Sequence, residues 1–523
     1  MRDFQMPGRS AVYARNGLCA TSHPLAAKAA VDVMQAGGNA MDAAIAGAVL
    51  LGICEPQMTG IGGDCFALIK PAGEDRILAL NGSGRAPAGQ SAARLRAMGE
   101  TVVPLRGVEA VTLPGAVDAF CRMSADWGRF DLAQTLAPAI AYAEEGVPVA
   151  PRVAFDWAED AGALTGDGRR YFLLNGQVPE PGQLFRAPGQ AEVLRRIAAE
   201  GRAGFYEGEV AEDMIACLRT QGGTHTLDDL AATRCDYADP VSGDYKGTEL
   251  VEHPPNGQGA TAVLLLNILN HFDLAAMDPF GAQRAHIEAE ATKLAYDARN
   301  RFIAEASPRL DHMLSPDTAA KLAALIDPAR AMASAAPLTE AVHKDTIYIT
   351  VVDRDRMAVS LIYSIFWGFG SGLASAKFGI NFQNRGAGFT LVEGHPNELA
   401  PGKRPMHTII PGMLRKAGRV TMPFGVMGGA YQPCGHARFV TNMVDYGLDP
   451  QAAIDAPRCF SGIDGLVVER GYSDSVRAEL AQMGHQVSLA VEPIGGAQNI
   501  LIDDSGVLIG ASDPRKDGCA LGY

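Results

Sequence analysis

Apolar residues recur at helical spacing through much of the first half of the chain. Residues 25–35 are rich in alanine and stop at Gly37-Gly38, a pair typical of a helix C-terminus. Asn39 can then cap a second helix, which is apolar nearly all round and is therefore predicted to be buried. The same spacing predicts helices over Phe130–Gly146 and Ala282–Phe302.

Strand patterns dominate just after the middle of the chain. Thr346–Val352 and Met357–Ile362 are apolar on both alternating faces, which indicates two strands buried from both sides, and the short polar stretch between them predicts a hairpin. An earlier strand over Glu249–Glu252 leads into a Pro-Pro-Asn-Gly turn. Residues 303–342 are punctuated by alanine and proline, so we expect an exposed tail there. Buried strands flanked by helices predict an α+β fold with four layers, αββα.

Composition indicates a large core and an acidic surface. With 523 residues and 47% apolar residues the chain can bury an extensive core, and its length alone suggests about three domains. The formal net charge of −14 argues against nucleic acid or an anionic membrane surface as a partner. The longest apolar stretch, Met41–Cys54, is shorter than the roughly 20 residues that a membrane span needs.

Cysteine, histidine and glycine patterns limit the chemistry further. The nine cysteines form no C-x-x-C pair, and Met1–Leu18 lacks the apolar run of a secretory signal, so we expect reduced thiols and a cytoplasmic location. The eleven histidines form no H-E-x-x-H motif, and the glycine-rich stretches lack the spacing of a dinucleotide fingerprint. We therefore expect neither a metal nor a cofactor.

Thr346 stands at the head of the first strand of the predicted hairpin. If the Asp345–Thr346 peptide bond were cut, the new chain would begin with a threonine whose α-amine lies beside its own hydroxyl. A hydroxyl needs an adjacent base to act as a nucleophile, and an N-terminal amine, with a pKa of roughly 8, can accept its proton. Taken alone, Asp345-Thr346 before a strand favours an ordinary strand start over a cleavage site.

Motifs spread over nearly the whole chain carry a family resemblance. They occur in one order, as follows: Ala20-Thr21-Ser22-His23-Pro24, Gly37-Gly38-Asn39-Ala40-Met41-Asp42, Gly60-Ile61-Gly62-Gly63, Leu113-Pro114-Gly115, Phe205-Tyr206-Glu207-Gly208, Pro254-Pro255-Asn256-Gly257-Gln258-Gly259, Lys403-Arg404-Pro405, Gly428-Gly429 and Ser512-Asp513-Pro514-Arg515. From Gly17 to the C-terminus the chain resembles the γ-glutamyltranspeptidase family, whose precursors cleave themselves before a threonine.

The resemblance implies an architecture and a maturation step. It implies the four-layer fold of N-terminal nucleophile hydrolases and cleavage between Asp345 and Thr346. Residues 1–345 would form a large, mostly helical subunit, and residues 346–523 a small subunit that starts with the nucleophile. The two products would stay together as one globular heterodimer, which could assemble into a larger oligomer.

The resemblance also implies a catalytic set. Thr346 would form the acyl-enzyme, and Ser364 would be the second hydroxyl that bonds the nucleophile. Gly428 and Gly429 match the pair whose backbone N–H groups form the oxyanion hole in the family. A glycine pair that merely ends a strand is the alternative for those two residues.

The residues that would hold the substrate depart from the family pattern near Ser364. Phe366 stands where the family has an asparagine, and Arg385 stands where it has a neutral amide. An ammonium group on the substrate would be repelled by an arginine there, whereas a carboxylate would be attracted. The alternative for Arg385 is a residue paired at the surface of a loop.

Two further departures concern the family's clamp for the substrate α-carboxylate. The clamping arginine is displaced to Arg85, and His407-Thr408 replaces a serine pair. A pocket carrying Arg85, Arg385 and His407 predicts a small anionic acyl group without a free α-amine.

Within the family, these sequences look like a divergent branch that includes glutathione hydrolase-like enzymes and oxamate amidohydrolase. The resemblance therefore favours a self-processing threonine amidohydrolase acting on an oxamate-like or dicarboxylic monoamide substrate. One alternative is a glutathione hydrolase or γ-glutamyltransferase whose clamp is rebuilt from Arg85. Another, of a different class, is an uncleaved paralogue that binds a ligand without turnover.

Overall fold

The structure is a computed structural model that describes residues 5, 8–332, 347–462 and 465–523. Its helices are α1 Pro24–Gln35, α2 Ala40–Cys54, α3 Ala92–Ala97, α4 Ala116–Trp127, α5 Leu132–Glu145, α6 Pro151–Asp160, α7 Gly166–Phe172, α8 Pro188–Glu200, α9 Ala203–Tyr206, α10 Gly208–Thr220, α11 Leu227–Ala231, α12 Gly259–Leu269, α13 Ala282–Phe302, α14 Leu310–Leu314, α15 Pro316–Ala323, α16 Gln432–Val444, α17 Pro450–Asp455 and α18 Asp474–Gln482.

The strands run through both halves of the chain. They are β1 Val12–Ala14, β2 Leu18–Thr21, β3 Asp64–Lys70, β4 Leu78–Gly82, β5 Val147–Pro148, β6 Leu184–Phe185, β7 Asp236–Ala238, β8 Val241–Tyr245, β9 Thr248–Glu252, β10 Ile347–Val352, β11 Ala358–Ser364, β12 Gly412–Lys416, β13 Arg419–Met427, β14 Cys459–Gly462, β15 Gly465–Val468, β16 Val487–Leu489, β17 Gly496–Ile502, β18 Leu508–Ser512 and β19 Cys519–Gly522.

Two antiparallel sheets of seven strands form the centre of the molecule. One has the order β19-β2-β10-β11-β3-β4-β7 and the other the order β1-β18-β17-β13-β12-β9-β8. The sheets pack face to face through apolar side chains such as Leu68, Val352 and Ala358 from the first and Val251 and Met413 from the second. Every residue of β10 and β11 is buried, as the apolar sequence of both strands predicts.

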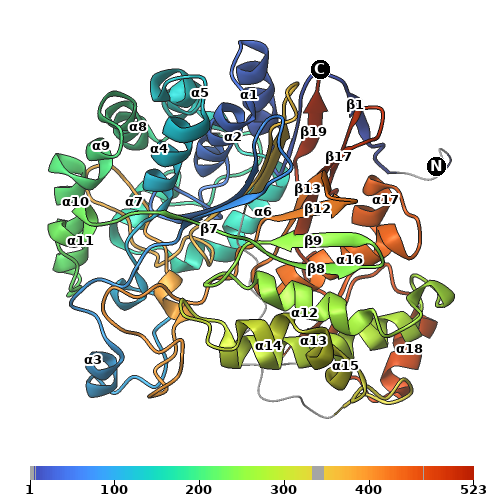
Figure 1. Cartoon of the computed structure of the whole chain (residues 1–523). Coiled ribbons are helices and arrows are strands. Elements are labelled where there is room, and N and C mark those ends of the chain that lie inside the picture. The colour runs from blue at the N-terminus through green and yellow to red at the C-terminus, as the bar shows by residue number, and fades with distance from the viewer. Residues whose placement is uncertain (1–4, 6–7, 333–346, 463–464) are drawn as a thin grey trace.

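Helices cover the outer face of each sheet and complete the four layers. Helices α1, α2 and α4 pack on the first sheet, and α12, α16 and α17 pack on the second. In Figure 1 the first group lies at the upper left and most of the second lies at the lower right, with the strands between them. The predicted αββα architecture of the N-terminal nucleophile hydrolases is therefore confirmed.

Helix caps and apolar periodicity in the sequence predicted the bounds of several elements. The Asn39 side chain caps α2 by accepting from the backbone N–H groups of Met41 and Asp42, and every residue of that helix is buried. The predicted helix Ala282–Phe302 has the bounds of α13, and β10 and β11 form the predicted hairpin.

The exposed tail expected over residues 303–342 is wrong for its described part. Helices α14 and α15 follow α13, and their residues Met313 and Ala319 belong to the buried core beneath α12. The alanines and prolines that suggested an open tail instead permit short helices in close contact. Residues 333–342 lie outside the described chain. No helix among the described residues is long and apolar enough to cross a membrane.

Candidate active site

The hairpin of β10 and β11 places Ser364, at the end of β11, next to the start of β10. Thr346 and Asp345 lie outside the described residues, so their predicted roles stay predictions. The first residue of β10, Ile347, pairs with Tyr363 of β11, and Ser364 follows directly at the end of that strand. On its other side Ser364 pairs with Asp64 at the start of β3, and both side chains are fully buried.

Arg385 lies against Ser364 in the interior of the protein. It begins the short 3-10 helix η4, Arg385–Gly388, and its side chain is 0% exposed. Its Nη1 donates to Oγ1 of Thr408 at 3.0 Å, and its Nη2 donates to Oγ of Ser364 at 3.3 Å. The alternative in which Arg385 is paired at the surface of a loop is therefore wrong. The predicted neighbourhood of Ser364, Arg385 and Thr408 is present.

The ring of Phe366 packs against the guanidinium of Arg385. The guanidinium carbon of Arg385 lies 4.2 Å from the centre of the Phe366 ring, a cation–π contact. The backbone at Phe366 has φ = 84°, a conformation that is uncommon for a bulky residue, and its N–H donates to Oγ of Ser364 at 2.9 Å. The Ser364 hydroxyl therefore accepts from both the backbone of Phe366 and the side chain of Arg385.

His407 is not the cation that the sequence suggested. It is fully buried, its Nε2 lies 3.0 Å from Oδ2 of Asp64, and its Nδ1 accepts from the backbone N–H of Ile409 at 3.4 Å. Burial, with a smaller effect from the nearby charge of Arg385, lowers the pKa of His407 to about 3. His407 is therefore neutral near neutral pH and donates its Nε2–H to Asp64. It positions the backbone next to Thr408.

Asp64 is a central residue that the sequence analysis missed. Besides the contact with His407, its Oδ1 accepts from Gly84 N at 2.8 Å, Gly115 N at 3.2 Å and Gln383 Nε2 at 2.9 Å. One carboxylate thus fastens four separate segments around Ser364. An acidic residue that directly follows a glycine run and begins a buried strand was the available signal.

Arg85 lies outside this cluster of contacts. Its Nη1 donates to Oε1 of Glu305 at 2.6 Å and to the carbonyl oxygen of Gly402 at 2.9 Å, and its side chain is 37% exposed. The prediction that Arg85, Arg385 and His407 share one cationic pocket is therefore wrong in two of its three members. Arg85 pairs with an acid near the surface, and His407 carries no charge.

Gly428 and Gly429 form a tight turn between β13 and α16. Their φ angles are 123° and 53°, values that favour glycine, and Gly429 opens the 3-10 helix η5, Gly429–Tyr431. Nε2 of Gln258 donates to the carbonyl oxygens of Gly429 at 3.0 Å and of Thr408 at 2.6 Å. This amide, which the sequence analysis did not single out, joins the predicted oxyanion turn to the Arg385 contacts.

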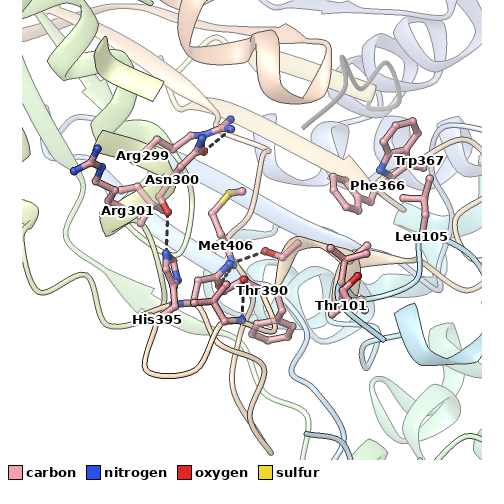
Figure 2. A pocket seen from close by; sticks show the side chains of 18 of the residues that line it. Thr101, Leu105, Arg299, Asn300, Arg301, Phe366, Trp367, Thr390, His395 and Met406 are labelled. Atoms are coloured by element: carbon pink, nitrogen blue, oxygen red, sulfur yellow. Dashed lines mark hydrogen bonds between the residues drawn. The ribbon is translucent and has the colours of Figure 1, made fainter. Parts of the chain in front are cut away.

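Phe366 also lines a cavity of about 550 Å³. Figure 2 shows Leu105, Phe366 and Trp367 at one end, and Arg299, Asn300, Arg301 and His395 at the other. Arg299 also donates from its Nη1 to Oε1 of Gln258 at 3.0 Å. The cavity wall is thus in direct contact with the residue that holds the glycine turn.

One cluster within the described part of the chain has side chains close enough for a metal. The donor atoms of His286, Glu290 and His485 lie within 4.8 Å of one another, and all three residues are buried. His286 Nδ1 lies 2.8 Å from His485 Nε2, however, and Glu290 accepts from Lys293 at 2.7 Å and from the backbone of Met332 at 2.8 Å. The ammonium group of Lys293 opposes a bound cation. These contacts instead hold the backbone at Met332 against α13.

Comparisons with known proteins show the family of the chain. The family model "Gamma-glutamyltranspeptidase" matches residues 26–523. The glutathione hydrolase-like YwrD proenzyme of Bacillus subtilis is 36% identical, with 96% of this chain and 97% of the relative covered. The oxamate amidohydrolase proenzyme of Klebsiella pneumoniae subsp. pneumoniae is 35% identical, with 97% and 98% covered. The crystal structure of cephalosporin acylase from Bacillus halodurans superposes with a TM-score of 0.92 at 38% identity, covering 100% of this chain and 99% of the other.

Proposed function

Because the chain belongs to the γ-glutamyltranspeptidase family and is an amidohydrolase of the N-terminal nucleophile type, we propose that it hydrolyses an amide of a small anionic acyl group. Thr346, freed by self-cleavage after Asp345, is the nucleophile in this proposal. Consecutive Cα atoms are about 3.8 Å apart. Thr346 is bonded to Ile347, and the strand partner of Ile347 is Tyr363, the residue before Ser364. Both hydroxyl-bearing residues are thus one residue away from the same strand pair, which supports a contact between the two hydroxyls.

The observation that carries the proposed acyl specificity is the buried position of Arg385 beside Ser364. Among its contacts are the hydroxyls of Ser364 and Thr408 and the ring of Phe366. A guanidinium attracts a substrate carboxylate and repels a substrate ammonium group, and the attraction and the repulsion are stronger in a buried site than in water. This supports a carboxylate on the acyl group and the absence of a free α-amine.

The proposed reaction has two halves. The α-amine of Thr346 accepts the hydroxyl proton as its oxygen attacks the amide carbon, and the leaving nitrogen takes a proton as the C–N bond breaks. Backbone N–H groups at Gly428 and Gly429 stabilise the oxyanion, a contribution of typically about 2.7–4 kcal/mol for one such donor. Water then cleaves the acyl-enzyme ester and releases the acid.

Names of relatives support the same substrate class. Oxamate, which names the Klebsiella relative, is a small anion without an α-amine. The glutathione hydrolase alternative needs a rebuilt clamp for an α-carboxylate, and the ion pair of Arg85 with Glu305 gives it little support. We therefore retain the anionic amide as the proposed substrate.

A panel of amides tests the proposal. Oxamate, succinamate, glutaramate, glutaryl anilide and γ-glutamyl anilide are assayed side by side for kcat/KM. We expect at least one acid without an α-amine to exceed the γ-glutamyl compound. A strong preference for γ-glutamyl amides or glutathione would contradict the proposal and favour a glutathione hydrolase.

A further inference from the structure

We propose that the cavity beside Phe366 binds the amine portion of the substrate and selects an amine with an apolar, benzyl-sized body over ammonia. The inference rests on the proposed function, because it assigns the second half of the same amide. The cavity is defined by its lining residues, which include Leu105, Phe366, Phe389 and Met406.

Three segments of the cavity wall continue directly into the Arg385 contacts. Phe366 lines the cavity while its N–H donates to Ser364. Gly388 lines it at the end of η4, the turn that begins with Arg385. Met406 lines it two residues before Thr408, to which Arg385 donates. A substrate whose carboxylate reaches Arg385 therefore has this cavity close by, because Phe366 both contacts Arg385 and lines the cavity.

A fourth connection leads to the predicted oxyanion turn. Arg299 lines the cavity and donates to Gln258, which in turn donates to the carbonyl oxygen of Gly429. Residues of the cavity wall thus connect both to the proposed acyl pocket and to the turn that would bind the reacting carbonyl oxygen. The portion of an amide that extends beyond its carbonyl on the far side from Arg385 is the amine.

The chemistry of the walls decides the class of amine. Val103, Phe366, Phe389 and Met406 contribute buried apolar surface, and Leu105 lies beside Trp367 at the same end in Figure 2. Binding pockets for small molecules are typically about 300–1,000 Å³ and mostly apolar. Ammonia would leave nearly all of the about 550 Å³ to water, whereas an aromatic or branched alkyl group would remove apolar surface from water.

A cavity that binds the amine affects only the acylation step of the reaction. In acylation the bond between Thr346 Oγ and the acyl carbon forms, the C–N bond breaks, and the amine leaves with the hydroxyl proton. Water then hydrolyses an ester that no longer contains the amine. The cavity therefore acts on acylation, and amides that share an acyl group share their deacylation step.

The experiment varies the amine while the acyl group stays fixed. Using the best acid from the amide panel, the primary, N-methyl, N-isobutyl and N-benzyl amides are compared by kcat/KM. Three proteins are compared: the wild type, the variant Leu105→Trp and the matched control Leu184→Trp. The Leu105→Trp variant places a large ring in the cavity. Leu184 is an exposed leucine on the short strand β6 and does not line the cavity. Side-chain replacement at Leu105 retains its backbone carbonyl, which accepts from Asn384.

We expect the wild type to hydrolyse the N-benzyl amide at least about tenfold better than the N-methyl amide, since apolar pocket contacts commonly give about 10–200-fold discrimination. Leu105→Trp should remove about tenfold or more of that preference, and Leu184→Trp, outside the cavity, should match the wild type on all four amides. Comparing variants on each substrate cancels the intrinsic reactivity of the leaving amine.

Equal kcat/KM across the amine series, or an equal loss on all four amides in Leu105→Trp, would overturn the inference. If Leu105→Trp does not fold, Val392→Trp at the exposed rim provides the same test. If only γ-glutamyl amides are hydrolysed, the proposed acyl group is wrong. The γ-glutamyl methyl and benzyl amides then test the cavity separately.

Discussion

Arg385 is the residue on which the proposed acyl specificity rests. Its guanidinium is fully buried, donates to the hydroxyls of Ser364 and Thr408, and lies over the ring of Phe366. A substrate carboxylate that reaches this guanidinium would gain a charge-assisted contact, whereas a substrate ammonium group would be repelled. The charged Arg385 thus contacts Ser364, one of the two hydroxyl residues of the proposed catalytic pair.

Arg385→Ala should lower kcat/KM for an anionic amide by about ten- to a hundredfold, because a charge-assisted contact to a carboxylate is worth roughly 1.5–3 kcal/mol. A neutral amide of similar size should lose far less, since it does not use the charge. Arg385→Lys, which keeps the charge without the planar geometry, should fall between the two enzymes. Equal losses on charged and neutral amides would mean that Arg385 only supports its turn.

Motif comparison found some site residues and misjudged others for physical reasons. Ser364, Arg385 and Thr408 follow recognisable motifs, so their proximity could be predicted. Burial is not visible in a sequence, and for that reason His407 was given a charge that its burial removes. Asp64 was missed because the glycine run and the strand start around it do not reveal that its carboxylate accepts from four segments distant in sequence.

At the scale of elements, caps and periodicity predicted what is local. Asn39 and Gly37-Gly38 marked the boundary between α1 and α2, and the run of apolar residues marked β10 and β11 as buried strands. Helices α14 and α15 were missed because each is short and is stabilised by packing beneath α12 rather than by its own pattern. Their short lengths hide the helical period.

Helix α1 carries an N-cap whose function depends on pH. The ring nitrogen Nδ1 of His23 accepts from the backbone N–H of Leu25 at 3.3 Å, and the side chain is buried. Burial lowers the pKa of His23 to about 4, compared with an ordinary value of 6.5. Between these values the unfolded chain binds a proton that the folded protein excludes, so stability falls as the pH falls through this range.

His23→Asn tests this dependence, because asparagine is a good cap and does not titrate. Relative to the variant, the wild type should lose about 3 kcal/mol of unfolding free energy between pH 7.5 and pH 4, since one pKa unit corresponds to 1.36 kcal/mol. Urea unfolding of both proteins at several pH values measures the difference. Parallel stability curves for the two proteins would show that His23 does not exclude its proton.

At the scale of the whole molecule, the sheets combine strands from both sides of the proposed cleavage point. In the first sheet β2, β3, β4 and β7 precede residue 345, while β10, β11 and β19 follow residue 346. Strand β10 lies between β2 and β11, so its edges pair with one strand from each side of that point. Cleavage would therefore leave two chains joined by an unbroken sheet and a shared core.

Maturation before Thr346 is the central claim, and the mass of the purified protein tests it most directly. Intact mass spectrometry under denaturing conditions should give two chains, Met1–Asp345 and Thr346–Tyr523, which elute together under native conditions. Thr346→Ala should give one full-length chain without amidase activity, and Thr346→Ser, which keeps a hydroxyl, should still be cleaved. An uncleaved wild type, or a small chain that begins at any other residue, would contradict the assignment of Thr346 as the nucleophile.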